Sequence, residues 1–458
     1  MKAQVLHEIN CLKFEDIPLP TVPEGWVLVE VKAVGICGSD IPRIFKTGAH
    51  RHPLVPGHEF SGRVLTEEEF NSPYDSVHIS VTHENIAEKA GAATKSCSET
   101  TESAAVTKSF PETTESAAVT KSCPETTEFV APHETSIQSE DIRIKVSNVQ
   151  RRWAGKRVGV FPLIPCGKCD CCKQKKYEMC SNYNYLGSRC DGAFAQYVAV
   201  PEWNLLPLPD FVSYETAAML EPMAVAAHAL RAAAPEKDDV AAVCGLGTIG
   251  LLMVMLLKQA GVKRILAIGN KDFQKDCIKL ISDNGSDKND NGRRSENSIS
   301  EECMIEFADL RTTDIEAWIL SRTGGQGVTL YFECVGKNET LLQAIRCTQP
   351  GGRIELVGNP ASDMLLDRDT YWKILRKQLT LRGTWNSSYW GETSLPVGNS
   401  VPDSTPEHMD DWHYVLKILP DIRPQLLITH RLPLAQLDKG LHIMRDKTED
   451  FVKIMILP

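Results

Sequence analysis

The stretch of chain between residues 239 and 259 constrains the fold of this 458-residue protein more than any other. An apolar run at residues 239–244 predicts a buried strand. It is followed at once by a G-x-G-x-x-G pattern made of Gly245, Leu246, Gly247, Thr248, Ile249 and Gly250. The first two glycines permit a tight turn and close approach of a pyrophosphate to backbone N–H groups, and the third lets the next helix pack on the strand. With a helix predicted at residues 248–259, the stretch indicates a dinucleotide-binding fold.

Strand-like and helix-like segments alternate through the region around this pattern. Apolar runs at residues 264–268, 328–333 and 353–357 predict further strands, separated by helical patterns. Such alternation is typical of a parallel, doubly wound sheet. We therefore expect an α/β fold with a nucleotide-binding domain at residues 223–385, in which the polar residues 282–300 form a surface loop.

The segment after the second strand of this domain departs from the usual pattern for NAD. An acidic residue about 20 positions beyond the glycine loop normally binds the ribose hydroxyls. Here the cofactor residues at that place are Gly269, Asn270 and Lys271. Loss of the carboxylate together with Lys271 would tolerate a 2′-phosphate, whereas Asp272 could still serve a ribose hydroxyl if the turn differs. The residues themselves leave the choice between NAD and NADP open.

The N-terminal part of the chain predicts short strands and then an insert. Residues 94–129 repeat with a 13-residue period, TKSCSETTESAAV, TKSFPETTESAAV and TKSCPETTEF, and contain no Leu, Ile, Met, Trp, Tyr or Gly. Such a segment buries too little apolar surface to offset its ordering entropy. We expect residues 66–150 to be a largely disordered insert. Strands are expected again near residues 157–161 and 196–200, with a closing strand in 451–458.

Closely spaced cysteines indicate a structural zinc site. Five of the 15 cysteines lie between residues 166 and 180, and four of them, at a spacing that suits one compact loop, are Cys166, Cys169, Cys172 and Cys180. Tetrahedral zinc takes four such ligands, and closed four-sulfur sites are structural. By spacing alone Cys171 could replace Cys172. A disulfide arrangement would require an oxidising compartment.

A second set of metal-binding residue types is dispersed along the chain, at Cys37, His58, Glu59 and Glu221. A thiolate, an imidazole and a carboxylate leave an open position for water or substrate, which is the composition of a catalytic zinc site. From spacing alone, a buried cysteine and a hydrogen-bonded histidine are the favoured explanation of these residues.

Charge and the N-terminal sequence exclude some partners. Lys and Arg number 50 against 60 Asp and Glu, which gives a formal net charge of −10 and argues against nucleic acid as a partner. The first 20 residues mix charges and lack the apolar core of a signal peptide. The uncharged residues 240–257 fit a strand, turn and helix better than a membrane span. We therefore expect a cytoplasmic protein that binds neither nucleic acid nor membrane.

Together these features resemble the zinc-dependent medium-chain alcohol/polyol dehydrogenase family. The resemblance rests on CGSDIPRIFKTGAH at residues 37–50, PGHEFSG at 56–62, LGSRCDG at 186–192 and MLEP at 219–222, with the cysteine cluster. It covers nearly all of the chain except the repeat insert and the loop at residues 282–300. It implies a mostly β, GroES-like catalytic domain from residues 1–222 and 386–458 beside a Rossmann domain.

The resemblance also implies two zinc ions per chain. Cys37, His58 and Glu221 would bind the catalytic zinc, with Glu59 as an alternative or exchanging ligand, and the four cysteines would bind the structural zinc. Ser39 would hydrogen-bond the alcohol and start a proton relay, and Asp40 would orient His58. NAD as the cofactor and a homodimer or homotetramer are implied as well.

The implied reaction is hydride transfer from a polyol phosphate to NAD(P), with galactitol 1-phosphate giving D-tagatose 6-phosphate. A cationic group must then hold the phosphate, and Arg43, Lys46 and Arg189 are candidates because guanidinium binds phosphate bidentately. His50 would contact the substrate or serve the relay. The alternatives are a sorbitol-type polyol or threonine dehydrogenase and, in another class, a catalytically silent, zinc-stabilised nucleotide-binding protein.

Overall fold

The computed structural model describes residues 1–71, 147–283, 303–360, 362–391 and 409–458. The 13-residue repeats and all but the first two residues of the loop expected at 282–300 lie outside the described residues. The two ends of the expected insert are helical, which corrects the prediction of disorder there. These helices are α2 (Glu67–Asn71) and α4 (Asn148–Trp153).

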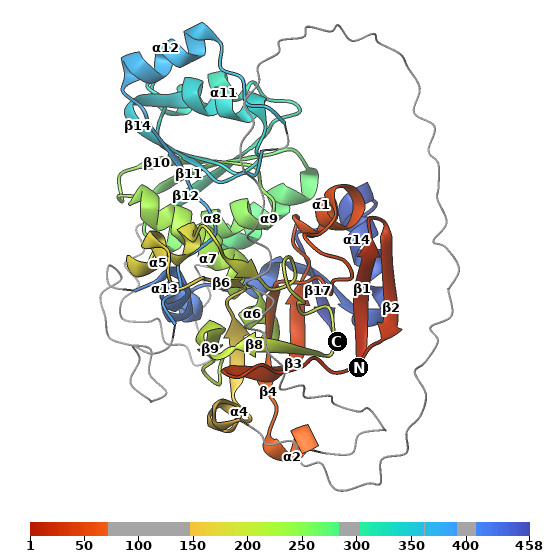
Figure 1. Cartoon of the computed structure of the whole chain (residues 1–458). Coiled ribbons are helices and arrows are strands. Elements are labelled where there is room, and N and C mark those ends of the chain that lie inside the picture. The colour runs from red at the N-terminus through yellow and green to blue at the C-terminus, as the bar shows by residue number, and fades with distance from the viewer. Residues whose placement is uncertain (72–146, 284–302, 361, 392–408) are drawn as a thin grey trace, which may run out of the picture.

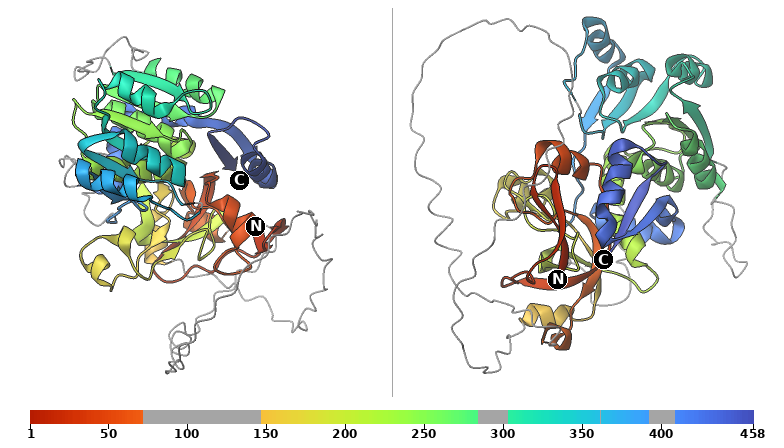
Figure 2. Two further views of the ribbon diagram at one scale, coloured as in Figure 1. Left: turned by 90° about the horizontal axis from the view of Figure 1, so that it is seen from above. Right: turned by 90° about the vertical axis from the view of Figure 1, so that its right-hand side faces the viewer.

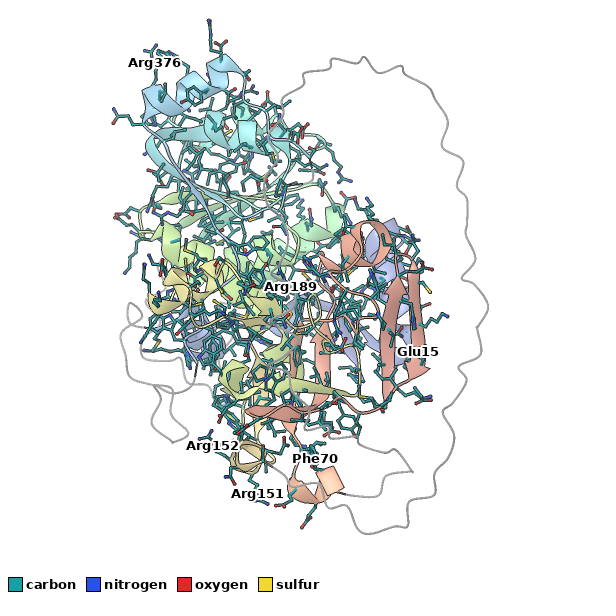
Figure 3. The ribbon with its side chains drawn as sticks, in the orientation of Figure 1. Glu15, Phe70, Arg151, Arg152, Arg189 and Arg376 are labelled. Carbon is teal, nitrogen blue, oxygen red and sulfur yellow. The ribbon has the colours of Figure 1, made fainter. Side chains whose placement is uncertain are left out.

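The two helices are held by contacts that the composition of the insert does not reveal. The buried Gln150 accepts a hydrogen bond from the Leu28 N–H at 2.8 Å and donates one to the Leu65 carbonyl at 2.7 Å. Arg151 of α4 donates to Glu67 of α2, and Figure 3 shows the two helices at the same end of the molecule. The insert therefore leaves and re-enters the fold at one place.

The first domain is built on a seven-stranded sheet that joins both ends of the chain. Its order is β16-β17-β3-β4-β5-β9, with β8 paired to β3. The strands are β3 (Trp26–Gly35), β4 (Glu59–Val64), β5 (Arg157–Val160), β8 (Tyr197–Pro201), β9 (Leu205–Pro207), β16 (Ile428–Pro433) and β17 (Lys453–Leu457). Figures 1 and 2 show β17 and α14, in blue, against the N-terminal strands, in red. The closing strand expected in residues 451–458 thus lies inside this sheet, between β16 and β3.

The second domain contains six parallel strands in the order β12-β11-β10-β13-β14-β15. They are β10 (Val240–Cys244), β11 (Arg264–Gly269), β12 (Met304–Asp309), β13 (Val328–Glu333), β14 (Thr348–Leu356) and β15 (Thr380–Gly383). Alternate residues of β10 pack into different clusters: Ala241 and Val243 lie with α7 and α8, and Ala242 and Cys244 lie with α10 and α11. Helices therefore cover both faces, and the predicted doubly wound sheet is confirmed.

The helices of the second domain and of its junction with the first are α7 (Leu220–Ala233), α8 (Thr248–Gln259), α9 (Asp272–Asp283), α10 (Ile315–Arg322), α11 (Asn338–Cys347), α12 (Arg368–Lys377) and α13 (Asp411–Ile418). The others are α1 (Asp40–Pro42), the π-helical turn η1 (Arg43–Thr47), α5 (Asp170–Lys173), α6 (Tyr214–Ala218) and α14 (Leu437–Asp446). Short 3-10 helices are η2 (Tyr177–Met179), η3 (Glu202–Asn204), η6 (Leu419–Asp421), η7 (Pro424–Leu427) and η8 (Leu434–Gln436). Two antiparallel pairs complete the described elements, β1 (Lys2–Glu8) with β2 (Cys11–Asp16) and β6 (Leu163–Ile164) with β7 (Asn184–Tyr185).

The uncharged residues 240–257 form β10, a glycine turn and most of α8. Gly245 has a φ of 97°, which a side chain would disfavour. A Cβ on Gly250 would collide with the carbonyl oxygen of Gly245, so the third glycine allows the helix to approach the turn. Among the described residues no helix is both long and apolar enough to cross a membrane.

Candidate catalytic and structural metal centres

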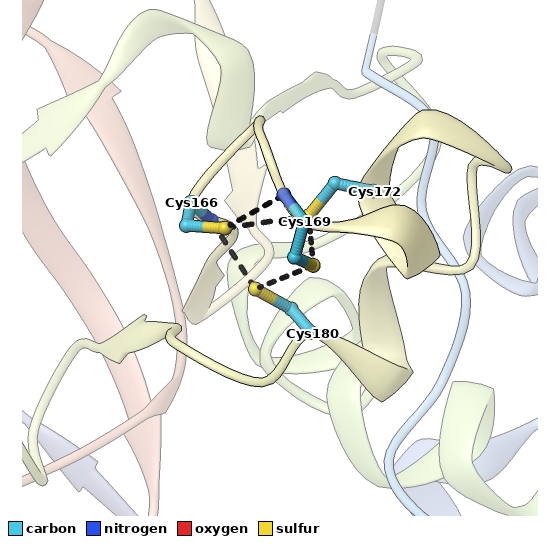
Figure 4. Close-up of side chains that lie close together, drawn as sticks. All are labelled: Cys166, Cys169, Cys172 and Cys180. Carbon is cyan, nitrogen blue, oxygen red and sulfur yellow. Dashed lines mark hydrogen bonds between the residues drawn. The ribbon is translucent and has the colours of Figure 1, made fainter.

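Four cysteine sulfurs converge on one point in the loop around α5. The Sγ atoms of Cys166, Cys169, Cys172 and Cys180 lie within 4.8 Å of one another, and Figure 4 shows them facing a common centre. All four are free cysteines, so the disulfide alternative is wrong for this set. Cys171 lies outside the group although it is adjacent to Cys172. The helix causes this difference, because neighbouring helical residues point in different directions.

The surroundings prepare part of this cluster to bind a cation. Backbone N–H groups of Cys172 and Ser181 lower the pKa of Cys169 to about 6. Those of Lys168 and Cys169 likewise lower the pKa of Cys166, whereas burial raises that of Cys172 to about 12. Because zinc binds thiolates, this donor set of four sulfurs fits a structural zinc ion.

The second centre lies where β3 ends and the neighbouring strand β4 begins. Gly35, at the end of β3, is paired with Glu59, at the start of β4. This register brings Cys37, just after β3, beside His58, just before β4. Donor atoms of Cys37, His58 and Glu59 all lie within 4.8 Å of one another. The dispersed residues noted in the sequence are therefore neighbours in the fold.

Glu221 approaches the same centre from the first turn of α7. Its Oε1 accepts a hydrogen bond from the Tyr185 hydroxyl at 3.2 Å, and the Tyr185 ring stands edge-on to His58 at 5.7 Å between ring centroids. Burial, and then the charge of Glu59, raise the pKa of Glu221 to about 7. It lies outside the compact group of three, in which Glu59 supplies the carboxylate.

Ser39 and Asp40 lie beside Cys37 and His58, two of the expected zinc ligands. The Ser39 hydroxyl donates to the Cys37 sulfur at 3.2 Å. Asp40 is buried, accepts a hydrogen bond from the Cys37 N–H at 3.0 Å, and has its Oδ1 3.5 Å from Nδ1 of His58. That His58 nitrogen is buried and has no hydrogen-bond partner in the described part of the chain. Asp40 therefore lies near this nitrogen without a hydrogen bond to it, and its orienting role stays a prediction.

Sequence reasoning missed Lys453, the first residue of β17. Its ammonium is buried, lies 2.5 Å from Oε2 of Glu59, and donates to the Ile36 carbonyl at 3.1 Å. Burial alone would lower the pKa of Lys453, but Glu59 and Cys37 raise it overall. The only signal in the sequence is one lysine within the apolar residues 451–457.

The charges of this centre suit a divalent cation. Three carboxyl groups and one thiol, those of Asp40, Glu59, Glu221 and Cys37, face two cationic side chains, Arg43 and Lys453. Burial, followed by the charges of Glu59 and Asp40, raises the pKa of the Cys37 thiol. A zinc ion would balance the two excess negative charges of the fully ionised centre and stabilise the thiolate. The donor set therefore fits a catalytic zinc.

Removal of the buried lysine should destabilise this centre. We expect Lys453→Met to lower the free energy of unfolding by about 3–5 kcal/mol, because it leaves the Glu59 carboxylate buried without its cation. Lys453→Arg keeps the charge and should lose less than half of that, as measured by chemical unfolding. Equal stability of wild type and Lys453→Met would show that the ion pair contributes nothing.

A cavity of about 330 Å³ opens beside the centre. It is lined by Ser39, Pro42, Arg43, Thr47, Gly48, Ala49, His50 and Ser188. Arg43 is part of the wall, and its Nη1 donates to Asp40 at 2.5 Å. The other two cations proposed for a phosphate do not line the cavity: Lys46 is exposed, and the guanidinium of Arg189 lies over the Tyr183 ring at 4.3 Å.

The predicted cofactor residues meet at the carboxyl ends of β10 and β11. Gly245, Gly247 and Gly250 form the turn into α8, and Asn270 and Lys271 follow β11. A second cavity, of about 310 Å³, lies at the ends of β11 and β12 and is lined by Asp272, Lys275, Phe307, Ala308, Asp309, Thr313 and Trp318. In open α/β sheets ligands bind outside this edge.

Comparison with known proteins gives matches along most of the chain. The family described as "Alcohol dehydrogenase GroES-like domain" matches residues 23–102 and 128–210, and "Zinc-binding dehydrogenase" matches residues 248–396. Galactitol 1-phosphate 5-dehydrogenase of Escherichia coli is 27% identical over 393 residues, covering 85% of each chain. L-Idonate 5-dehydrogenase of Vitis vinifera is 31% identical over 362 residues, covering 78% of this chain and 73% of the relative. The crystal structure of galactitol-1-phosphate dehydrogenase from Escherichia coli superposes with a TM-score of 0.67 at 23% identity, over the whole of both chains.

Proposed function

Since this chain belongs to the zinc-dependent medium-chain alcohol/polyol dehydrogenase family, and is an NAD(P)-linked enzyme of that class, we propose that it oxidises a polyol phosphate, converting galactitol 1-phosphate to D-tagatose 6-phosphate. The observation that carries the proposal is the cavity of about 330 Å³ beside the Cys37 and His58 centre, with Ser39, Arg43 and His50 on its wall. The similarity to the galactitol 1-phosphate enzyme supports this substrate.

Cys37 and His58 would hold the catalytic zinc, with Glu221 as the third ligand and Glu59 exchanging with it. When bound, zinc polarises the substrate hydroxyl and the nicotinamide ring accepts hydride. Ser39 accepts the proton that the substrate hydroxyl loses. It passes its own proton toward His50, an exposed side chain on the same wall. Asp40 keeps the His58 ring in place from behind.

Arg43 is the cation that we assign to the substrate phosphate. Its guanidinium lines the cavity and uses one nitrogen for Asp40, which leaves further N–H donors for phosphate oxygens. Arg189 contributes from beside Ser188, which lines the same cavity, once its guanidinium leaves the Tyr183 ring.

The assay that tests this proposal compares galactitol 1-phosphate with galactitol, sorbitol and threonine, each with NAD and with NADP. We expect kcat/KM to be higher for the phosphorylated polyol by roughly 10-fold or more, the size of one charge-assisted contact. Arg43→Ala should remove most of that ratio. Arg43→Ala also removes the hydrogen bond to Asp40, and this loss would lower kcat/KM for the phosphorylated and the free polyol alike. The ratio of the two kcat/KM values therefore reports the phosphate contact alone. Lys46→Ala, an exposed cation outside the cavity wall, is the matched control.

Two results of this assay would contradict a polyol phosphate as the substrate. Equal kcat/KM for galactitol 1-phosphate and free polyols, or a preference for threonine, would assign the enzyme to a sorbitol-type or threonine substrate. Absence of turnover with every pair would leave a silent nucleotide-binding protein or an enzyme for a substrate outside this set.

The assembly proposed is a homodimer or homotetramer. Large apolar side chains are exposed on and just before α12, the helix that connects β14 to β15: Leu365, Tyr371, Trp372 and Leu375. An exposed group of this kind is typical of a protein interface. Light scattering of the purified protein measures the mass directly.

A further inference from the structure

The end of β11 has no room for the carboxylate that would bind a ribose diol. A Cβ on Gly269 would collide with Oε1 of Gln274 and lie 2.9 Å from Cε2 of Phe307 and 3.1 Å from Cδ1 of Leu246. The backbone of Gly269 itself permits a side chain, since its φ is not in the left-handed region. Packing rather than backbone conformation therefore opposes an acidic residue at this position, because the Gln274 and Phe307 side chains would have to shift.

Gln274 of α9 occupies the space and holds the loop. Its side chain is buried, and Oε1 accepts hydrogen bonds from the N–H groups of Asn270 at 2.8 Å and Lys271 at 3.1 Å. Its Nε2 donates to the carbonyl of Leu246, between the first two glycines of the cofactor loop, at 2.9 Å. A neutral amide thus ties the two cofactor loops together where a negative charge would otherwise repel a phosphate.

The acidic groups around this position are already paired. Arg311 places Nη2 2.5 Å from Asp272 and 2.6 Å from Asp309, and its Nε donates to Asp309 at 3.0 Å. Both carboxylates that could take a ribose hydroxyl are therefore ion-paired with the same guanidinium, which offsets one of their two negative charges.

Lys271, by contrast, forms no ion pair with any residue that the structure describes. Its ammonium lies over the rings of Phe273, at 5.4 Å, and Phe451, at 5.3 Å. The two aromatic rings limit where this charge can go without neutralising it. It remains an available cation next to the place from which the carboxylate is excluded.

A cavity of about 310 Å³ at the ends of β11 and β12 lies beside the Lys271 loop, because Asp272 is on its wall. Phe307 lines this cavity and also contacts the position of Gly269, so the cavity and the Gln274 loop adjoin. Trp318 and Phe307 offer apolar surface to a base, and Lys275 adds a second cation on the wall.

Resting on the proposed function, we infer that this site takes the 2′-phosphorylated adenosine of NADP in preference to that of NAD. Lys271 is the residue that sets the preference, and Gln274 is a positioning residue that keeps the loop in place and a carboxylate out. The 2′-phosphate gains a charge-assisted contact with Lys271 and meets no unpaired carboxylate.

The test is calorimetric binding of two probes to the zinc-loaded, full-length protein, adenosine 2′,5′-bisphosphate and adenosine 5′-monophosphate, which differ only in the 2′-phosphate. We expect the bisphosphate to bind about 10-fold more tightly or better at one fixed ionic strength. Lys271→Ala should bring the two affinities to within a factor of about 3. Lys279→Ala, an exposed lysine two turns farther along α9, should leave the difference unchanged.

The outcomes separate this inference from the proposed function. Equal or tighter binding of the monophosphate would overturn the NADP preference while leaving a dinucleotide enzyme intact. A full preference retained in Lys271→Ala would overturn the role of that lysine. If neither probe binds, the proposed function fails together with the inference. A double variant, Gly269→Asp with Gln274→Ala, makes room for a carboxylate and should reverse the preference toward the monophosphate.

Discussion

Replacing Cys37 by serine is expected to lower kcat for every polyol by roughly 1,000-fold or more, while the protein stays folded. The thiol is the soft donor of the buried group that also contains His58 and Glu59. Serine is close in size but is a poor zinc ligand at neutral pH, so the centre should lose its metal. Zinc analysis of the purified variant should find one ion per chain instead of the two expected for wild type.

Cys277→Ser is the matched control, because Cys277 is a partly buried cysteine on α9, outside both sulfur-containing centres. Its kcat and zinc content should equal those of wild type. If Cys37→Ser keeps both zinc ions and full turnover, Cys37 is not a ligand and the catalytic centre lies elsewhere.

Replacing Cys172 by alanine is expected to lower the free energy of unfolding by more than about 4 kcal/mol. Cys172 is buried among the sulfurs of Cys166, Cys169 and Cys180, and four thiolates are needed to close a structural zinc site. Loss of one ligand frees the zinc and leaves the loop between β6 and β7 without its cross-link. Chemical unfolding and zinc analysis measure the two consequences together.

The neighbouring cysteine makes the experiment specific. Cys171 belongs to the same short helix but lies outside the group of four. Cys171→Ala should change the free energy of unfolding by less than about 1 kcal/mol and keep the zinc. If Cys172→Ala and Cys171→Ala have the same free energy of unfolding and the same zinc content, the cluster does not hold a metal.

Local patterns in the sequence predicted the parts of the fold that depend on local physics. The turn at Gly245 needs a positive φ, and the helix predicted at residues 248–259 has those bounds in the structure. The four cysteines lie within 15 residues of one another, so their spacing alone made a cluster plausible. In both cases the residues that determine the structure lie close together in the sequence.

Contacts between segments far apart in the sequence could not be predicted from local patterns. Lys453 reaches Glu59 across 394 positions of the chain, and only the pairing of β17 with β3 brings them together. Gln274 gives no sign in the sequence that it fills the space beside Gly269. The relative places of Glu59 and Glu221 depend likewise on how α7 packs against the first sheet.

Arg43 shows a different limit of sequence reasoning. Residue type identified it as a candidate phosphate ligand, and it does line the cavity beside Ser39. The structure adds that its guanidinium also donates to Asp40, behind His58. One side chain therefore connects the proposed substrate pocket with the proposed metal centre, a relation that no spacing in the sequence indicates.

The measurement that tests the central claim most directly is reduction of the nicotinamide by the zinc-loaded protein with galactitol 1-phosphate, run beside His58→Ala prepared identically. His58 is buried in the proposed catalytic centre and takes no part in the four-cysteine cluster. We predict turnover by wild type and a loss of roughly 1,000-fold or more in His58→Ala, with the structural zinc retained in both. Equal rates for the two proteins would contradict a catalytic metal centre at His58.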